Sequence, residues 1–291
     1  MVKRIARITL ISGVAIVLLM AVAMIWLKVH EEELVFAAAI SRQHLLSTLP
    51  ADAELTAVPI AKSPDIAGLV FRADPQVDNG FWILQLHGNA DSAFSRWQVR
   101  HCEALREAGF NVLEIDYRGF GRTPGQPSEI GMYADVEAAY HALMQRGVAA
   151  NRIVILGHSL GSGPAVRLAT RHPAAALVLF GAFTSIPDAA AERYPYLPVR
   201  LAVAVQFNSL GRIRDVHMPV VIAHSREDTL IPYSHALKLY AAANQPKHLI
   251  TFEFPSSDGF GGHVDSLYDH VNVLQAALAG LVPGLPPPRN P

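Results

Sequence analysis

The sequence predicts an α/β fold in which a mostly parallel β-sheet carries helices on both faces and follows one N-terminal transmembrane helix. From about residue 60 onward, short β-rich apolar runs alternate with amphipathic segments, and this alternation is typical of strand–helix–strand crossover units. Before that point lies an uncharged apolar stretch that is long enough to cross a bilayer. A chain of 291 residues is long enough for one large domain with its own core.

The N-terminal stretch Ile8–Leu27 contains no charged residue, and as a helix it would span the hydrocarbon core of a membrane. Three basic residues precede it, namely Lys3, Arg4 and Arg7. This positive flank predicts that the short N-terminus is cytoplasmic and that the main body lies on the opposite side of the membrane. A buried core helix is a poor alternative, because no face of the stretch is polar.

A cleaved signal peptide is a second interpretation of this stretch. Ala21–Ala23 and Ala37–Ala39 resemble small-residue cleavage sites, but the first lies inside the apolar run, which is longer than a usual signal core. We therefore expect an uncleaved anchor at residues 1–30. A linker or amphipathic lead-in is expected at residues 31–60, beginning with the acidic cluster Glu31–Glu33.

The main domain is expected at residues 61–282. Its predicted strands are Phe81–Leu86, Asn111–Tyr117, Ile153–Leu156, Ala176–Phe180, Val220–Ala223 and Leu249–Phe254. Its predicted helices are Ser95–Ala108, Met132–Arg146, Pro164–His172, His235–Ala243 and Val264–Leu281. The proline-rich residues 283–291 are expected to be a disordered tail.

One connection, residues 184–216, is too long for an ordinary turn and is rich in apolar and aromatic side chains. Long excursions of this kind are often lids or binding loops. Tentative substrate contacts within this lid candidate are Tyr194, Tyr196, Leu201 and Phe207. The alternative, left open by the sequence, is that these side chains pack on the core.

Composition excludes several classes of function. The formal net charge of −1 offers no basic excess for a phosphate backbone, so we expect no nucleic-acid partner. The single cysteine, Cys102, excludes an intrachain disulfide framework and a cysteine-rich zinc site, and its position indicates the apolar side of a helix.

The segment Gly157–Gly161, with sequence GHSLG, directly follows a predicted strand and directly precedes a predicted helix. This G-x-S-x-G pattern is typical of a sharp strand-to-helix turn that holds a nucleophilic serine clear of the sheet, with glycines relieving the crowding. Ser159 is therefore the candidate nucleophile. The alternative is a structural or phosphate-binding glycine turn, although the Gly-Lys-Ser/Thr ending of a P-loop is absent.

Three other predicted strands end in residues that acyl transfer needs. After Phe81–Leu86 comes His87-Gly88-Asn89, where the Asn89 N–H could join that of Leu160, the residue after the serine, in an oxyanion hole. After Val220–Ala223 comes Asp228, a carboxylate that could orient a histidine, with its neighbour Glu227 as the rival. After Leu249–Phe254 comes a glycine-rich loop that ends in His263, a candidate general base.

The remaining histidines carry less weight, because the chain has 13 of them. Four are expected on the surface or on helix faces: His101, His141, His172 and His270. The chain order Ser159, Asp228, His263 is the nucleophile–acid–base order of the α/β-hydrolase arrangement.

With these residues in place, the sequence resembles the α/β-hydrolase superfamily. It is most similar to the small membrane-anchored serine hydrolases of the bud-emergence (Bem) type and to related α/β-hydrolase-domain proteins. The matching stretches cover most of residues 65–275: LHGNA, DYRGFGRTPGQPSEIGMYADV, GHSLGSGPAV, the YPYLPVR segment, the Asp228–Pro232 turn and GGH. The resemblance implies an α/β-hydrolase fold with a short lid and an N-terminal anchor.

For the site, the resemblance implies Ser159 as nucleophile, Asp228 and His263 as its partners, and Asn89 and Leu160 as oxyanion donors. One departure is His224-Ser225 where the family usually has His-Gly. In DYRGFGRT, Asp116 and Arg118 are expected to tie the loop near the site rather than to act in catalysis.

The predicted function is a membrane-anchored serine hydrolase that cleaves an ester or thioester of a small or lipid-like acyl substrate through an acyl-enzyme. It would need no cofactor and no metal. The alternatives are a catalytically silent membrane-tethered scaffold with the same fold, and a metallohydrolase using His87, Asp116, His224 and His263, which lack a recognised ligand spacing. The sequence leaves open the acyl chain, the leaving group and the oligomeric state.

Overall fold

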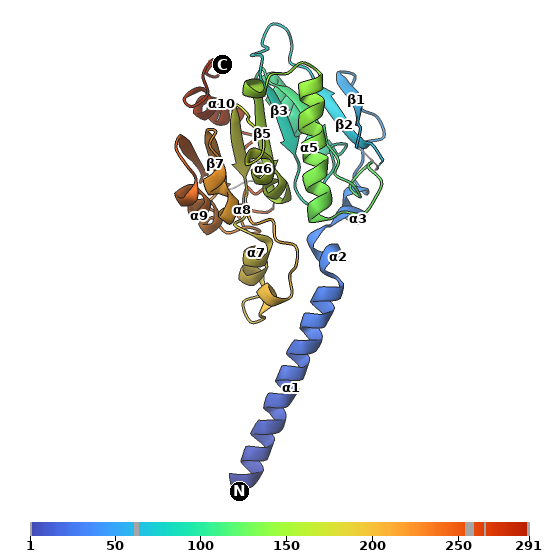
Figure 1. Ribbon diagram of the computed structural model, residues 1–291, viewed down its shortest axis with the longest axis vertical. Coiled ribbons are helices and arrows are strands. Elements are labelled where there is room, and N and C mark those ends of the chain that lie inside the picture. The colour runs from blue at the N-terminus through green and yellow to red at the C-terminus, as the bar shows by residue number, and fades with distance from the viewer. Residues whose placement is uncertain (1, 61–63, 254–258, 265, 290–291) are drawn as a thin grey trace.

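The computed structural model describes residues 2–60, 64–253, 259–264 and 266–289, with the side chains of residues 2–8 left aside. An eight-stranded sheet runs in the order β1-β2-β4-β3-β5-β6-β7-β8 and forms an α/β-hydrolase fold (Figure 1). The strands are β1 (Ala53–Val58), β2 (Ile66–Phe71), β3 (Trp82–Leu86), β4 (Asn111–Ile115), β5 (Ile153–His158), β6 (Ala176–Phe180), β7 (Val220–Ser225) and β8 (Lys247–Phe252).

Helices connect the strands and extend the chain at its N-terminus. They are α1 (Val2–Val29), α2 (Glu31–Val35), α3 (Ala38–Ser41), α4 (Arg96–Glu107), α5 (Glu129–Gln145), α6 (Ser162–Ala169), α7 (Ile186–Arg193), α8 (Ser209–Arg212), α9 (Ser234–Ala242) and α10 (Val271–Ala279). Four short 3-10 turns are η1 (Ala150–Arg152), η2 (Ser159–Gly161), η3 (Val199–Leu201) and η4 (Ile213–Asp215).

The six predicted strands correspond to β3–β8, which all pair in parallel. Strands β1 and β2 were not predicted from the sequence; they form an antiparallel pair that joins the sheet through an antiparallel contact between β2 and β4. Since β1 lies within the segment predicted as a linker, the sheet begins before residue 61, the predicted start of the domain.

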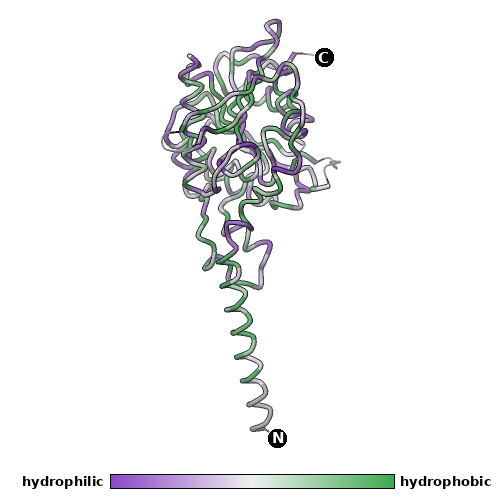
Figure 2. The backbone as a smooth tube through the Cα atoms, turned by 90° about the vertical axis from the view of Figure 1, so that its right-hand side faces the viewer, coloured by the Kyte–Doolittle hydropathy of each residue, from purple (hydrophilic) through white to green (hydrophobic). Residues whose placement is uncertain are grey.

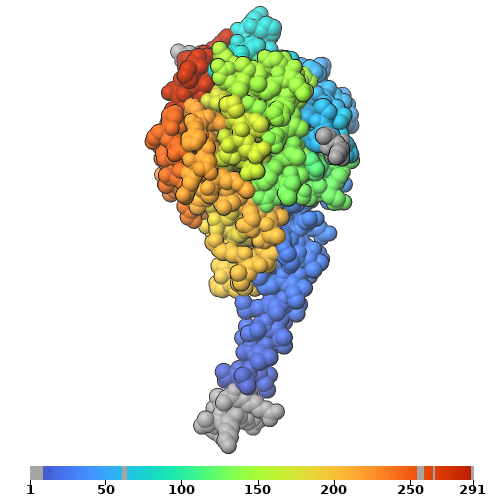
Figure 3. Space-filling model, in the orientation of Figure 1, coloured from blue at the N-terminus to red at the C-terminus, as the bar shows by residue number. Residues whose placement is uncertain are grey.

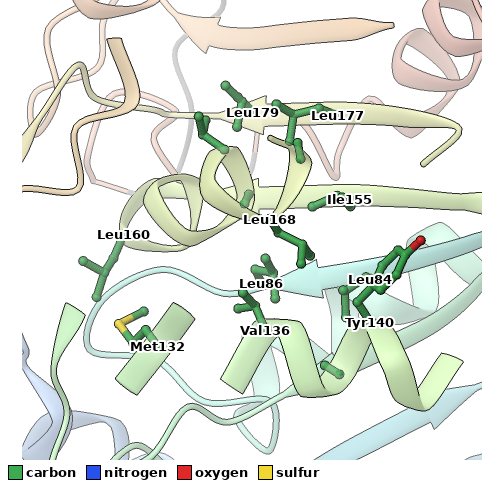
Figure 4. Close-up of a cluster of buried hydrophobic side chains, with 14 of the residues drawn as sticks. Leu84, Leu86, Met132, Val136, Tyr140, Ile155, Leu160, Leu168, Leu177 and Leu179 are labelled. Carbon is green, nitrogen blue, oxygen red and sulfur yellow. The ribbon is translucent and has the colours of Figure 1, made fainter. Parts of the chain in front are cut away.

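Two apolar clusters cover the two faces of the sheet. Successive residues of a strand point to opposite faces, so Leu84 of β3 joins one cluster and Ile83 joins the other. The first cluster receives side chains from α5, α6 and α9, and the second receives them from α4 and α10. Figure 4 shows part of the first cluster, where Val136 of α5 and Leu168 of α6 lie over Leu84 and Ile155. Burial on both faces is what a parallel sheet requires.

Helix α1 extends away from this domain. Its segment Thr9–Val29 has 21 residues, a mean hydropathy of 2.7 and no buried positions. Figure 2 shows this segment as predominantly hydrophobic. At 1.5 Å per residue such a segment is about 32 Å long, which matches a hydrocarbon core of about 30 Å. The helix is thus long and apolar enough to cross a membrane.

The lid candidate, residues 184–216, divides into two parts. Helix α7 and turn η3 protrude from the domain at the end where α1 leaves it (Figures 1 and 3). The second part, with α8 and η4, packs into the first apolar cluster through Ile213 and Val216. The protruding part is therefore shorter than the sequence predicts.

Candidate active site

The turn after β5 has the geometry that the G-x-S-x-G pattern predicts. Ser159 has a left-handed backbone with φ of 48°, which is unusual for a residue other than glycine. A Cβ atom on Gly157 would lie 2.6 Å from the Ala165 side chain, and one on Gly161 would lie 2.2 Å from the Leu86 carbonyl oxygen. Glycine is therefore required at both positions by close packing.

Ser159, His263 and Asp228 come together although more than 30 residues separate any two of them. The His263 Nε2 atom lies 2.9 Å from Ser159 Oγ, and its Nδ1 atom lies 2.6 Å from Asp228 Oδ2. Both distances are within hydrogen-bond range. In this arrangement Nδ1–H donates to the carboxylate, which leaves Nε2 free to accept the serine proton.

Asp228 is held by several donors at once. Its Oδ1 atom accepts hydrogen bonds from the backbone N–H groups of Leu230, at 2.9 Å, and Ile231, at 2.8 Å. Its Oδ2 atom faces His224 Nε2 at 3.1 Å as well as His263. Burial alone would raise the pKa of Asp228, but the hydrogen bonds from His224 and His263 outweigh it and hold the pKa well below its usual value.

The rival carboxylate, Glu227, is exposed, whereas Asp228 is buried. From the sequence, His224 was predicted as the first residue of the loop that carries Asp228 and as a member of an alternative metal site, but not as a partner of Asp228. Its place four residues before the aspartate was the one available signal.

His158, the residue before the serine, was not singled out by the sequence analysis either. Its ring stacks on Phe180 with centroids 4.9 Å apart, and its Nε2 atom lies 2.8 Å from the His263 carbonyl oxygen. Burial and the neighbouring His263 keep the pKa of His158 well below its usual value. A neutral ring can donate Nε2–H to that carbonyl and so hold the loop that carries His263.

The two predicted oxyanion donors, Asn89 and Leu160, line the same cavity as Ser159. Among the described residues, the backbone N–H of Asn89 donates to no protein acceptor. Its side chain is occupied: Oδ1 accepts from Ala37 N–H at 2.8 Å, and Nδ2 donates to the Val35 carbonyl at 2.9 Å.

The cavity has a volume of about 280 Å³. Of the four tentative lid contacts, only Tyr194 lines it. Tyr196 and Leu201 lie in solvent, 92% and 85% exposed, because the turn around η3 projects beyond the cavity. Phe207 is fully buried and packs edge-on against Phe36 and Tyr133. It is therefore a core residue and not a substrate contact.

Asp116 and Arg118 have the structural surroundings that were expected. Asp116 is fully buried and accepts hydrogen bonds from the Ala93 and Arg122 N–H groups at 2.8 and 2.7 Å. Arg118 pairs with the buried Asp135 through its guanidinium group. Both residues fix loops rather than face the cavity.

The four residues of the metallohydrolase alternative do not form a ligand group. Within the described part of the chain, three or more potential ligand atoms converge to within 4.8 Å only at Glu137, His141 and His172. There His172 Nε2 and Arg171 already contact the Glu137 carboxylate, at 2.7 and 3.3 Å.

Comparisons with known sequences find relatives over part of the chain. The family model of the serine aminopeptidases (S33) matches residues 82–210. An uncharacterized protein of Mycobacterium tuberculosis is 40% identical over 58% of the chain and 59% of its own length. The lysophosphatidylserine lipase ABHD12 of Danio rerio is 35% identical over 61% of the chain and 52% of its own length. The chain thus spans little more than half the length of these relatives.

Solved structures share the fold at low sequence identity. An esterase of Pyrococcus furiosus superposes with a TM-score of 0.61 at 20% identity, covering 78% of this chain and 94% of its own. A serine hydrolase without a lid from Xanthomonas campestris superposes with a TM-score of 0.60 at 16% identity, covering 83% and 100%.

Proposed function

Because the chain belongs to the α/β-hydrolase superfamily, we propose that it is a serine hydrolase that cleaves carboxylic esters or thioesters through an acyl-enzyme intermediate. The observation that carries this proposal is the continuous hydrogen-bonded chain from Ser159 through His263 to Asp228. A catalytically silent scaffold would have no need for a strained serine that faces both a histidine and a cavity.

The proposed reaction has two steps. In the first, Ser159 Oγ attacks the substrate carbonyl carbon while its proton passes to His263 Nε2, and the carbonyl oxygen becomes an oxyanion held by the N–H groups of Asn89 and Leu160. When the oxyanion collapses, His263 gives the proton to the leaving alcohol or thiol, and the acyl group stays on the serine. In the second step, water attacks the acyl-enzyme carbonyl while its proton passes to His263 Nε2. When this second oxyanion collapses, the bond to Ser159 Oγ breaks, His263 returns the proton to that oxygen, and the acid is released.

The substrate is proposed to be an amphiphile with an acyl chain. The cavity beside Ser159 is lined mainly by apolar residues, among them Phe183, Ile186 and Val199. Apolar walls with a few polar groups at one end suit an acyl chain whose carbonyl is fixed at the serine. One relative is a lysophosphatidylserine lipase, which is consistent with a lipid-like ester.

Helix α1 is proposed to anchor the enzyme in a membrane, with the short N-terminus on the cytoplasmic side and the hydrolase domain on the other. The length and hydropathy of Thr9–Val29 support the anchor, and Lys3, Arg4 and Arg7 before it support the orientation. Extraction of membranes with sodium carbonate tests the anchor, because an embedded protein stays in the pellet. Release into the supernatant would contradict it.

A fluorophosphonate probe on membranes that contain the full chain tests the enzyme class. We expect labelling in the wild type and none in Ser159→Ala. Loss of labelling in His263→Ala at unchanged melting temperature would indicate that His263 activates Ser159. A wild-type protein that is folded yet unlabelled would support the silent scaffold instead.

A further inference from the structure

The segment between the apolar helix and the sheet, predicted as a linker, borders the cavity of Ser159. Leu27 near the end of α1 and Leu34 and Val35 of α2 line this cavity. Residues of the lid candidate line it too, among them Ala190 of α7 and Val203. The cavity therefore lies between two segments that are 150 residues or more apart in sequence. Both segments lie at the end of the domain from which α1 leaves (Figures 1 and 3).

Glu31 joins these two segments. Its Oε1 atom accepts hydrogen bonds from the backbone N–H groups of Ala204 and Val205, at 2.5 and 2.6 Å. Its Oε2 atom accepts one from Lys28 Nζ at 2.8 Å. Burial alone would raise the pKa of Glu31, but these hydrogen bonds outweigh it and lower the pKa, so the side chain is a carboxylate at neutral pH.

The burial of Glu31 sets it apart from its neighbours. It is only 8% exposed, whereas Glu32 and Glu33 on the same short helix are exposed. Hydrogen bonds to a buried carboxylate are among the stronger ones in proteins, and their loss would leave two backbone donors of the lid without a partner.

A second attachment lies between the same segment and the loop after β3. The Asn89 side chain bonds to the Val35 carbonyl and the Ala37 N–H, so the residue that supplies a proposed oxyanion donor also holds the end of α2. Next to it, Phe36 is buried in the first apolar cluster. The segment is thus attached both to the lid candidate, through Glu31, and to the loop after β3, through Asn89.

We propose that α2 is a wall of the acyl-binding cavity and that Glu31 is the positioning residue that holds the lid against it. This inference rests on the proposed hydrolase function and specifies how its substrate is held. The acyl chain would lie between the juxtamembrane helix and the lid, so the preference for chain length would depend on residues outside the sheet and its loops. The end of α1 and helix α2 would then contribute to substrate specificity as well as attach the enzyme to the membrane.

Limited trypsin digestion of the full chain in detergent tests the link to the lid. Arg193 and Arg200 are exposed cleavage sites within the lid. In Glu31→Ala, cleavage at these sites should accelerate about tenfold or more, as expected for the loss of hydrogen bonds to a charged group. Glu31→Gln, which keeps the shape and one acceptor oxygen, should give an intermediate rate. Glu33→Ala, an exposed position on the same helix, is the matched control and should digest like the wild type.

Hydrolysis of p-nitrophenyl esters of graded chain length tests the wall. Leu34→Trp should lower kcat/KM for the dodecanoate about tenfold relative to the butyrate, because the larger ring fills the cavity where the distal end of a long chain would lie. Leu237→Trp is the matched control: Leu237 on α9 is 47% exposed, Leu34 is 49% exposed, and only Leu34 lines the cavity. Fluorophosphonate labelling of Ser159 should be unchanged in Leu237→Trp, which lies outside the cavity.

The outcomes separate the two proposals. An unaltered chain-length profile in Leu34→Trp, or trypsin rates in Glu31→Ala equal to those in Glu33→Ala, would overturn the inference while Ser159 still labels. Absence of Ser159-dependent hydrolysis in the wild type would overturn the proposed function and, with it, the assignment of the cavity to an acyl chain. The trypsin comparison would still decide whether Glu31 holds the lid.

Discussion

Replacing Asp228 by asparagine perturbs the proposed site at a single atom. The Asp228 Oδ1 atom accepts from the Leu230 and Ile231 N–H groups, so an asparagine would keep its oxygen there. Its NH₂ group would then replace Oδ2, which lies 2.6 Å from His263 Nδ1 and 3.1 Å from His224 Nε2. A donor in that place favours the His263 tautomer with the proton on Nε2, which cannot accept the proton of Ser159.

The expected loss follows from that change of tautomer. The corresponding change in serine proteases lowers kcat about 10⁴-fold, and we expect a loss of the same order for Asp228→Asn with p-nitrophenyl butyrate. Because aspartate and asparagine have the same shape, substrate binding should change little, so the loss should appear in kcat rather than in KM. Steady-state kinetics of the purified full-length variant measure both.

Glu227→Gln is the control for this prediction, because it removes the neighbouring charge from an exposed position. Its kcat should stay within about twofold of the wild type, as expected for a surface substitution. The reasoning is refuted if Asp228→Asn, folded as judged by its melting temperature, keeps kcat within tenfold of the wild type. Equal losses in the two variants would refute it as well.

Three further predictions concern the surroundings of the site. His158→Phe removes the donor to the His263 carbonyl and should lower kcat about tenfold at nearly constant KM, as seen in steady-state kinetics. Burial raises the pKa of Glu114 to about 8 from its ordinary 4.5, so the native state binds the extra proton and stability falls as pH rises between these values. Glu114→Gln should therefore flatten the dependence of Tm on pH between about pH 5 and 8. Gly161→Ala should destabilise the fold by about 3 kcal/mol or more in urea unfolding, because its Cβ would lie 2.2 Å from the Leu86 carbonyl oxygen.

Each of these has an internal control. Gly280→Ala, whose Cβ would meet nothing closer than 3.6 Å, should keep its stability, and a loss equal to that of Gly161→Ala would contradict the packing argument. A Tm that depends on pH in Glu114→Gln as it does in the wild type would assign the effect to another group. An effect of His158→Phe on KM alone would show that His158 does not position the base.

The strands that supply the proposed triad could be predicted because β5 and β7 begin as continuous apolar runs and β8 carries Leu249, Ile250 and Phe252, and because a glycine-rich or acidic segment follows each in the sequence. The two missed strands differ: β1 carries a weak pattern at the edge of the sheet, whereas β2 is a buried apolar run that is interrupted by Gly68. Strand β1 buries only Val58 fully, and β2 contains Gly68, which lies where a Cβ would approach the Glu114 carbonyl at 2.7 Å. An edge strand without regular alternation has no local signal that separates it from a linker.

The contacts that refine the site are long-range, and that is why the sequence did not reveal them. Glu31 reaches Ala204 across 173 positions, and His158 reaches the His263 carbonyl across 105. In the sequence, Glu31 is one of three adjacent glutamates, and only the fold distinguishes the one that is buried. The role of Phe207 likewise depends on packing, because an aromatic residue in a long connection can equally well line a substrate cavity or pack in the core.

The proposal that Ser159 forms an acyl-enzyme is tested most directly by mass spectrometry of the intact protein. The full chain is mixed with a p-nitrophenyl ester and quenched within the first turnover. We predict that the mass rises by one acyl group, that peptide mapping places the group on Ser159, and that the adduct decays at the rate of turnover. Turnover at the wild-type rate by Ser159→Ala, or turnover without an adduct on that peptide, would contradict the account.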